Sequence, residues 1–206
     1  MTMPSSCRRP LYALLVTAIV TAACRGDAAP ATPQVADPPK AVAPASGADQ
    51  EVVETVEKVL TTAVHPGLTW SAIADVAPAL KGVYDAEPDR LLWFDGITAV
   101  ASVPKTLAAI AGAGDHGLNP DDYDAGPLAE QWKALAAGTA SAADRALFDL
   151  GVSVAASRML RGVYIGRVDP ATMLWGYDIK AKPFDLVARL QEARGTAGLE
   201  AVVAQL

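Results

Sequence analysis

The sequence predicts an all-α protein, an irregular bundle of several helices. The chain is rich in Ala, Leu and Val, and apolar residues recur every three to four positions in several segments, as they do on helices. Patterns that alternate between apolar and polar residues, which are typical of strands, are scarce. Gly, Pro and Ser/Asp groups separate the periodic segments at positions where helices begin or end. We find no internal repeat and no pair of strands joined by a clear turn.

The first 23 residues have the pattern of an export signal. Arg8 and Arg9 precede an apolar run over residues 11–23, which is shorter than the roughly 20 residues needed to span a membrane. Small residues at its end are typical of a cleavage site. The residues Thr-Ala-Ala-Cys at 21–24 resemble the bacterial lipobox, whose cysteine receives a diacylglycerol. This resemblance implies a lipoprotein signal peptide over 1–23 and a lipid anchor in a membrane at Cys24.

The alternative is an ordinary secretory signal in which Cys24 is incidental. Lipidation is favoured because a free cysteine is unusual in an exported chain. Arg25 stands where an Asp would resemble the signal that keeps lipoproteins in the inner membrane, so the outer membrane is favoured. We therefore expect a protein of the bacterial cell envelope that faces the periplasm.

Residues 24–50 are expected to form a disordered tether rich in Pro and Ala, because they lack aromatic residues and apolar periodicity. Without the two signal arginines, 15 Lys and Arg stand against 23 Asp and Glu, a net charge of −8. This balance excludes nucleic acid as a partner, because its binding depends on Lys and Arg that neutralise phosphates. The remaining residues, 51–206, suffice for one helical domain with a sizeable core.

Two helices are expected at the start of this domain. The first covers residues 50–64, which carry valines and leucines at helical spacing, and His65 after it would be a cation near the negative end of the helix dipole. The second would begin with Thr69 as its N-cap. Pro78 lies inside its apolar pattern and should kink or shorten it. Residues 86–97 then predict an irregular loop with a dense apolar segment.

The later segments predict further helices separated by capping residues. A helix over about 100–112 ends at a group of glycines, and Asn119-Pro120 has the pattern of an N-cap followed by proline at the first helical position. Another helix ends at Gly138. Ser141 and Asp144 form a capping-box pattern at the start of the longest helix, roughly 142–162, which is apolar on two sides and therefore central. Two short helices are expected near 183–193 and 196–206.

Three sequence blocks are more specific than this periodicity. They are LWFD at 92–95, HGLNPDDY at 116–123 and LRGVYIGRVDP at 160–170. In this order they resemble the helical scaffold domain of the large periplasmic L,D-transpeptidases, which cross-link peptidoglycan through a catalytic cysteine. The resemblance covers roughly residues 51–206. Its matching positions include Trp93, Asp95, His116, Asn119, Tyr123, Arg167 and Asp169.

The resemblance implies a non-catalytic scaffold portion of such an enzyme. Its implied partners are a downstream L,D-transpeptidase catalytic module and peptidoglycan. Catalytic domains of the family need a thiolate and a His base, and no cysteine follows Cys24. We therefore expect this chain alone to have no activity and its scaffold domain to be truncated at the C-terminus. If the gene continues past Leu206, we expect the full-length protein to be an L,D-transpeptidase. The alternative is a stand-alone helical envelope lipoprotein that binds a partner protein or a glycan.

The candidate residues have structural as well as binding interpretations. His116 and Asn119 fit a capping or hinge role at a helix boundary, and tryptophans such as Trp93 either belong to the core or stack on sugar rings. Arg167 and Asp169 would form an internal salt bridge or bind backbone carbonyls, with ligand contact as the alternative. No metal-ligand spacing, phosphate loop or catalytic constellation is present, so we expect no metal, no cofactor and no catalytic residue.

Overall fold

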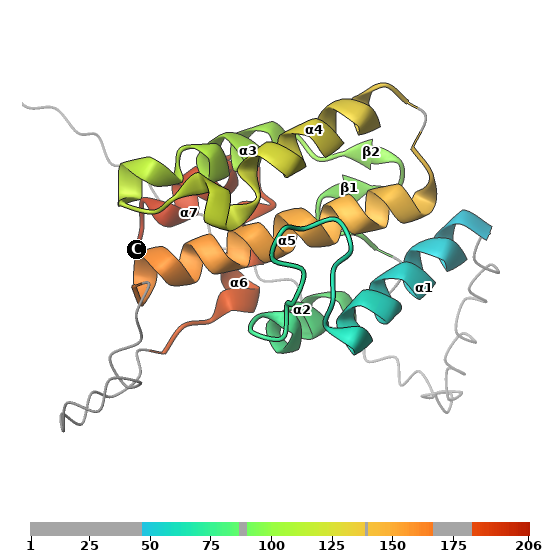
Figure 1. Ribbon diagram of the computed structural model, residues 1–206, viewed down its shortest axis with the longest axis horizontal. Coiled ribbons are helices and arrows are strands. Elements are labelled where there is room, and N and C mark those ends of the chain that lie inside the picture. Colours follow the sequence, from blue (N-terminus) through green and yellow to red (C-terminus); the bar gives the residue numbers. More distant parts are fainter. Residues whose placement is uncertain (1–46, 87–89, 139, 167–182) are drawn as a thin grey trace, which may run out of the picture. The chain divides into compact units, whose positions relative to one another are not determined.

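The computed structural model describes residues 47–86, 90–138, 140–166 and 183–206, which all belong to one compact unit, Ala43–Leu206. Helix α5 (Ala142–Tyr164) is the centre of this unit. It contacts α1 (Gly47–Thr62), α3 (Val103–Ala111), α4 (Ala125–Ala136), α6 (Leu186–Ala193) and α7 (Gly198–Val203). Figure 1 shows α3 and α4 on one side of α5 and α1 and α2 (Ala77–Tyr84) on the other. The expected all-α, irregular multi-helix bundle is confirmed.

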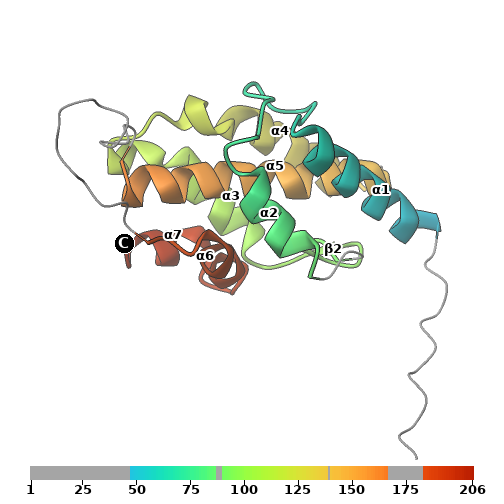
Figure 2. The same cartoon turned by 90° about the horizontal axis from the view of Figure 1, so that it is seen from below.

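The burial of α5 explains its composition. All residues from Phe148 to Ser157 are buried, so no face of this segment is left to solvent. Small residues allow neighbours to approach: a Cβ on Gly151 would lie 3.0 Å from Leu128 of α4. The turned view in Figure 2 shows helices above and below α5. The expectation of a central, buried helix is therefore confirmed.

Local capping determines where α5 begins. The Ser141 hydroxyl accepts from the Asp144 amide at 3.0 Å, and the Asp144 carboxylate accepts from the Ser141 amide at 2.9 Å, which completes the expected capping box. These reciprocal bonds satisfy amides that would otherwise have no intrahelical partner. They also hold the pKa of Asp144 below its ordinary value, so its carboxylate stays ionised near the positive end of the helix.

Helix α1 packs on α5 through four apolar residues at helical spacing, Val52, Val56, Val59 and Leu60. It begins at Gly47, so the last four residues of the segment expected to be a disordered tether, 47–50, are helical instead. The apolar pattern began only at Val52, and this is why the sequence placed the boundary too late.

The expected helix beginning at Thr69 is wrong in its first half. Residues 63–76 form an irregular segment, and helix begins only at Ala77, with Pro78 in its first turn. We call residues 63–76 the crossing loop, because in Figure 1 they pass over α5. Ile73 and Val76 are buried at helical spacing, but their backbone bonds go to a turn and to the Val64–Ala72 bridge. Long-range contacts thus override a periodic pattern.

A short hairpin begins inside the loop expected over 86–97 and ends two residues after it, which the sequence pattern did not predict. Strands β1 (Phe94–Asp95) and β2 (Thr98–Ala99) pair antiparallel around Gly96, whose φ is +62°. With two residues a strand, the alternating pattern is too short to recognise. The apolar segment before it is buried as expected, from Leu91 to Phe94.

The turn between α3 and α4 follows the predicted capping chemistry. Two 3₁₀ helices, η1 (Ala113–His116) and η2 (Pro120–Tyr123), are joined by Gly117, whose φ of +71° suits glycine. The Asn119 side chain accepts from the Asp121 amide, which confirms it as the N-cap of η2. In the described part of the chain, no helix is long and apolar enough to cross a membrane.

Candidate functional site

The crossing loop has a well-supported backbone although it has no regular structure. The Thr69 amide donates to the buried carboxylate of Asp124 at 2.7 Å, and Gln131 of α4 donates to the Gly67 carbonyl at 3.1 Å. Inside the loop, the His65 amide donates to the Ser71 carbonyl at 2.7 Å. Two of these bonds join the loop to α4 and its N-cap Asp124, and the third closes the loop on itself, so the loop presents its side chains from a preorganised frame.

Arg158 of α5 is the main support of the loop. Its Nη1 donates to the Trp70 carbonyl at 3.3 Å and its Nη2 to the Ala72 carbonyl at 2.6 Å. Its Nε and Nη2 also bind the two oxygens of Asp75, at 3.1 and 2.9 Å. The Arg158 side chain is only 16% exposed. A guanidinium can satisfy this many acceptors because its donors form a rigid planar fork.

Two adjoining cavities lie beside this support and share Arg158 as a lining residue. The larger, of about 500 Å³, lies against the crossing loop, and the smaller, of about 290 Å³, lies against the C-terminal part of α5. We call the two together the Trp70 groove. Its lining residues are Thr69, Trp70, Ser71, Ala72, Asp75, Asp122, Tyr123, Arg158, Arg161, Gly162, Ile165 and Gly166.

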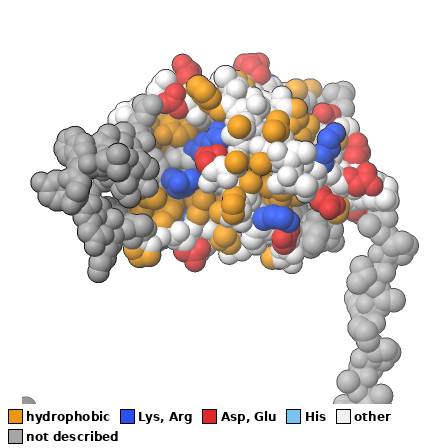
Figure 3. All heavy atoms as spheres, turned by 60° about the horizontal axis from the view of Figure 1, so that its bottom comes forward, with side chains coloured by type: hydrophobic (Ala, Val, Ile, Leu, Met, Phe, Trp, Pro, Cys, Tyr) orange, Lys and Arg blue, Asp and Glu red, His pale blue; other side chains and the backbone are white. Residues whose placement is uncertain are grey.

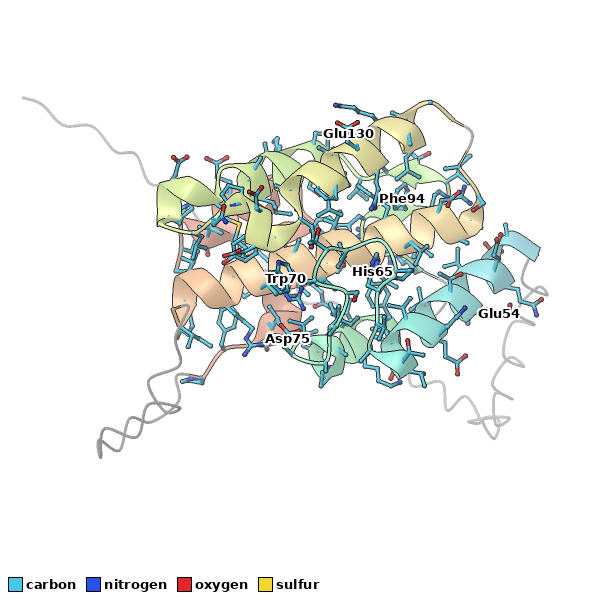
Figure 4. All side chains as sticks on the ribbon, viewed as in Figure 1. Glu54, His65, Trp70, Asp75, Phe94 and Glu130 are labelled. Carbon is cyan, nitrogen blue, oxygen red and sulfur yellow. The ribbon has the colours of Figure 1, made fainter. Side chains whose placement is uncertain are left out.

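Trp70 is the most unusual side chain of this groove. It is 59% exposed, whereas Trp93 is fully buried. Figure 4 shows Trp70 and Asp75 on the loop where it passes over α5. An indole held in solvent by a rigid backbone offers an amphipathic surface to a ligand. Trp70 could not be recognised as a candidate from the sequence, because its exposure depends on a loop whose apolar pattern is typical of a helix.

The groove carries one more positive than negative charge at its smaller cavity. Burial would raise the pKa of Asp75, but the hydrogen bonds and charge of Arg158 hold this pKa below its ordinary value, so Asp75 is ionised at neutral pH. Arg161 donates from Nη1 to the Asp75 carbonyl at 2.9 Å. Figure 3 shows basic side chains next to acidic ones on a face that is largely apolar and uncharged. Arg158 and Arg161, three positions apart near the C-terminal end of α5, were the available sequence signal.

The motif residue Trp93 lies in a buried polar network away from the groove lining. Its indole Nε1 donates to the Ser153 hydroxyl at 2.9 Å, Ser153 donates to the Tyr84 oxygen at 2.8 Å, and Tyr84 donates to Asp149 at 2.5 Å. The direction of this chain follows from its ends, because an indole N–H only donates and a carboxylate only accepts. Trp93 therefore anchors the LWFD block to α2 and α5.

Asp149 completes this network and was missed in the sequence. Its carboxylate also accepts from the amides of Leu92 and Trp93, at 3.1 and 2.6 Å. Burial raises the pKa of Asp149 to about 6, although these donors act in the opposite direction. Burial and the neighbouring Asp149 raise the pKa of Tyr84 well above its ordinary value, so Tyr84 remains a donor. These partners lie far apart in sequence, so spacing could not reveal them.

Asp95, the last residue of the LWFD block, lies at the surface. It forms ion pairs with Arg90 and with Arg194, which follows α6. Arg194 also donates from Nε to the Leu92 carbonyl at 2.9 Å. The LWFD block thus receives contacts from α2, α5 and the end of α6, and its arrangement supports the fold.

The HGLNPDDY block contributes to the edge of the groove. His116 is exposed on η1, and Asn119 caps η2, while the buried Tyr123 and its neighbour Asp122 line the two cavities. Arg167 and Asp169, and likewise Cys24, lie outside the described residues. Of the candidates that lie in the described ranges, Tyr123 alone lines the groove.

The interpretation of His65 as a cation at a helix end is wrong. His65 is fully buried, and burial lowers its pKa. The Gly67 amide donates to Nδ1 at 3.2 Å, so Nε2 carries the hydrogen and donates to the Leu147 carbonyl at 2.8 Å. His65 is thus a neutral link between the crossing loop and α5.

The described residues of the groove do not form a cluster of metal ligands. Within the described ranges, no group of three or more His, Cys, Asp or Glu side chains is placed to hold a metal ion. Asp75 is the acidic residue closest to such a role, but Arg158 occupies both of its oxygens. The arrangement can bind and orient a ligand.

Comparison with known proteins identifies the family of this fold. A family model described as "Scaffold domain" matches residues 78–206, which run from the first turn of α2 to the end of α7. Comparisons with curated proteins and with solved structures found no match. The matched range contains all three blocks that resemble the scaffold domain of the L,D-transpeptidases, and it covers more than half of the sequence. The chain therefore belongs to the Scaffold domain family.

Proposed function

We propose that this chain is the non-catalytic scaffold portion of a cell-wall L,D-transpeptidase, where it positions a catalytic module at peptidoglycan. The observation that carries the proposal is the family match over residues 78–206. The chemistry of the chain agrees with a scaffold role, because transpeptidation through a thiolate needs a cysteine nucleophile and residues 25–206 contain none.

The structure supports a positioning role in a second way. The LWFD block is held by Asp149 and Arg194, and the HGLNPDDY block forms a capped turn. Both blocks thus use their polar residues to stabilise the domain. Such a domain can hold another module in a defined geometry, which speeds a reaction by orientation alone.

A reconstitution experiment tests this role. The purified chain is mixed with an L,D-transpeptidase catalytic module that contains the nucleophilic cysteine, and cross-linked muropeptide dimers are measured by chromatography. The chain alone should form none, and the module should form more dimers with the chain than without it. Turnover by the chain alone, or no effect of the chain on the module, would refute the scaffold role.

The proposed location is the periplasmic side of the envelope, with a diacylglyceryl anchor on Cys24. The supporting observation is the lipobox-like TAAC segment after a short apolar run. Mass spectrometry of the N-terminal peptide from membrane fractions tests it, with Cys24→Ala as the control. An unmodified Cys24 in a mature, released chain would contradict the anchor.

A further inference from the structure

We infer that the Trp70 groove binds a saccharide that carries a carboxylate, with the indole of Trp70 under the sugar ring and the guanidinium of Arg161 on the carboxylate. This inference gives a site and a ligand chemistry to the proposed contact with peptidoglycan, in which the lactyl carboxylate of muramic acid is free where the glycan strand carries no stem peptide. It rests on that proposal only for the source of the sugar. The groove itself is argued from its own contacts.

Trp70 presents an exposed aromatic side chain at the larger cavity. A large aromatic side chain that is 59% exposed loses apolar contact with the protein. The Trp70 carbonyl is held by Arg158, and the neighbouring Thr69 amide is held by Asp124. The backbone therefore keeps the indole at the larger cavity, where a flat ligand with one apolar face can stack on it. A pyranose ring is such a ligand.

Arg158 and Arg161 use different parts of their guanidinium groups in hydrogen bonds. Arg158 grips the Asp75 carboxylate with its Nε and Nη2, the edge of a guanidinium that suits bidentate binding. Arg161 uses only Nη1, in its bond to the Asp75 carbonyl. Among the described residues, its Nε and Nη2 have no partner. The same edge that holds one carboxylate in Arg158 is thus available for another in Arg161.

The side chains that line the smaller cavity leave it with a net positive charge. Arg158 does not compete for a ligand, because its hydrogen bonds go to Asp75 and to two backbone carbonyls. Asp75 in turn offsets the charge of Arg158, so the smaller cavity keeps the positive charge of Arg161. The chain as a whole has a net charge of −6. A cationic cavity on an acidic protein favours an anionic ligand locally and disfavours anionic surfaces in general.

The two cavities have the size of a typical ligand pocket. Ligand pockets are typically about 300–1,000 Å³, and the two adjoining cavities, of about 500 and 290 Å³, offer room for a sugar ring and for its acidic substituent. The site also combines two parts of the chain. Trp70 and Asp75 precede residue 78, where the family match begins, while Arg158 and Arg161 lie inside it. The family match therefore covers only part of the groove.

The test is a titration of the purified, ¹⁵N-labelled chain with three disaccharides, followed by NMR. The first joins N-acetylglucosamine to N-acetylmuramic acid. The second, diacetylchitobiose, has a hydroxyl in place of the lactyl ether that carries the carboxylate, and the third joins N-acetylglucosamine to glucuronic acid. We expect the muramic disaccharide to bind about tenfold more tightly than chitobiose, as expected for one charge-assisted bidentate contact. Tight binding of the glucuronic disaccharide as well would support the inference and widen the source to other acidic glycans.

Two variants assign the roles. Trp70→Ala should weaken the muramic disaccharide and chitobiose alike, by about tenfold. Arg161→Gln should remove the preference for the acidic sugars and leave the affinity for diacetylchitobiose unchanged. Matched controls are Ile97→Ala, which removes an apolar side chain that is 78% exposed on the hairpin, and Arg189→Gln, which removes a charge from α6. Thermal unfolding of each variant shows that it is folded.

The remaining outcomes overturn the inference. These are no binding of the acidic disaccharides at millimolar concentration, equal affinity for the acidic and neutral sugars, binding unaffected by Arg161→Gln or Trp70→Ala, and free lactate that binds as tightly as the disaccharide. None of them affects the scaffold role, because that role is measured by the activity of an added catalytic module. The two proposals therefore fail separately.

Discussion

Asp149 shows how one residue can determine the position of a whole sequence block. Its carboxylate accepts from one side chain and two backbone amides, and all three donors are buried with it. Burying a carboxylate is costly unless such donors compensate. The raised pKa of about 6 reflects that cost. Asp149 therefore gives the LWFD block a defined position while making the stability of the domain depend on pH.

We predict that Asp149→Asn flattens part of this pH dependence. Between pH of about 4 and 6, the folded protein keeps a proton on Asp149 that the unfolded chain, with its ordinary carboxylate, has already released. The contribution of this group to the free energy of unfolding therefore falls as pH rises through this window and is constant above it. The total effect is up to about 3 kcal/mol. Urea unfolding of both proteins at several pH values measures it.

The variant should also be less stable than the parent at low pH, by about 1–3 kcal/mol. Even when protonated, the carboxyl group has two oxygens that can accept, whereas an asparagine has one, so at least one of the three donors loses a good partner. The stability difference between the two proteins should then shrink as pH rises from 4 to 6. A difference that is constant over this range would show that Asp149 does not titrate there.

At the scale of elements, what the sequence predicts depends on how far apart the interacting residues lie. The capping box of Ser141 and Asp144 and the Asn119 cap were predictable because each joins residues two or three positions apart. The crossing loop was not, because Arg158 and Asp124 determine its path from distant parts of the chain. The groove depends on that path, so Trp70 and Arg161 could be recognised as a site only in the structure.

Gly162 of α5 tests how closely η2 packs on this helix, and Gly82 of α2 serves as a control with more space around it. A Cβ on Gly162 would lie 2.9 Å from the Tyr123 hydroxyl, whereas one on Gly82 in α2 would meet only Val187, at 3.5 Å. Alanine is favoured over glycine in a helix by roughly 1 kcal/mol. Gly82→Ala should therefore stabilise the domain by about 0.5–1 kcal/mol. Gly162→Ala should destabilise it by about 1–2 kcal/mol, because overpacking outweighs propensity. Urea midpoints compare the two, and equal shifts would contradict the close approach.

At the scale of the whole molecule, the folded unit is larger than residues 78–206, the range that matches the family model. Helix α1 and the crossing loop precede residue 78, yet α1 packs on α5 and His65 and Asp75 bind it through side chains and backbone. The core and the groove are therefore shared between the matched range and the segment before it. A scaffold domain that completes its core in this way depends on both parts for its stability.

We predict that residues 47–206 fold and that residues 78–206 alone do not. Without α1, the side of α5 that it covers is exposed, and the burial of Val52, Val56, Val59 and Leu60 is lost. Each fully buried aliphatic side chain contributes roughly 1.5–3 kcal/mol. The four together are therefore comparable with the whole stability of a domain, about 5–15 kcal/mol.

Circular dichroism and sedimentation of the two fragments provide the test. The longer fragment should unfold cooperatively as a monomer, because its core is complete. The shorter one should lack a cooperative transition and should self-associate through the exposed face of α5, as large apolar patches do. A point control is Val56→Asp in the longer fragment, which places a charge in the same interface and should give the same behaviour. A monomeric, cooperative 78–206 fragment would mean that the matched range is a complete domain and that α1 is an accessory to it.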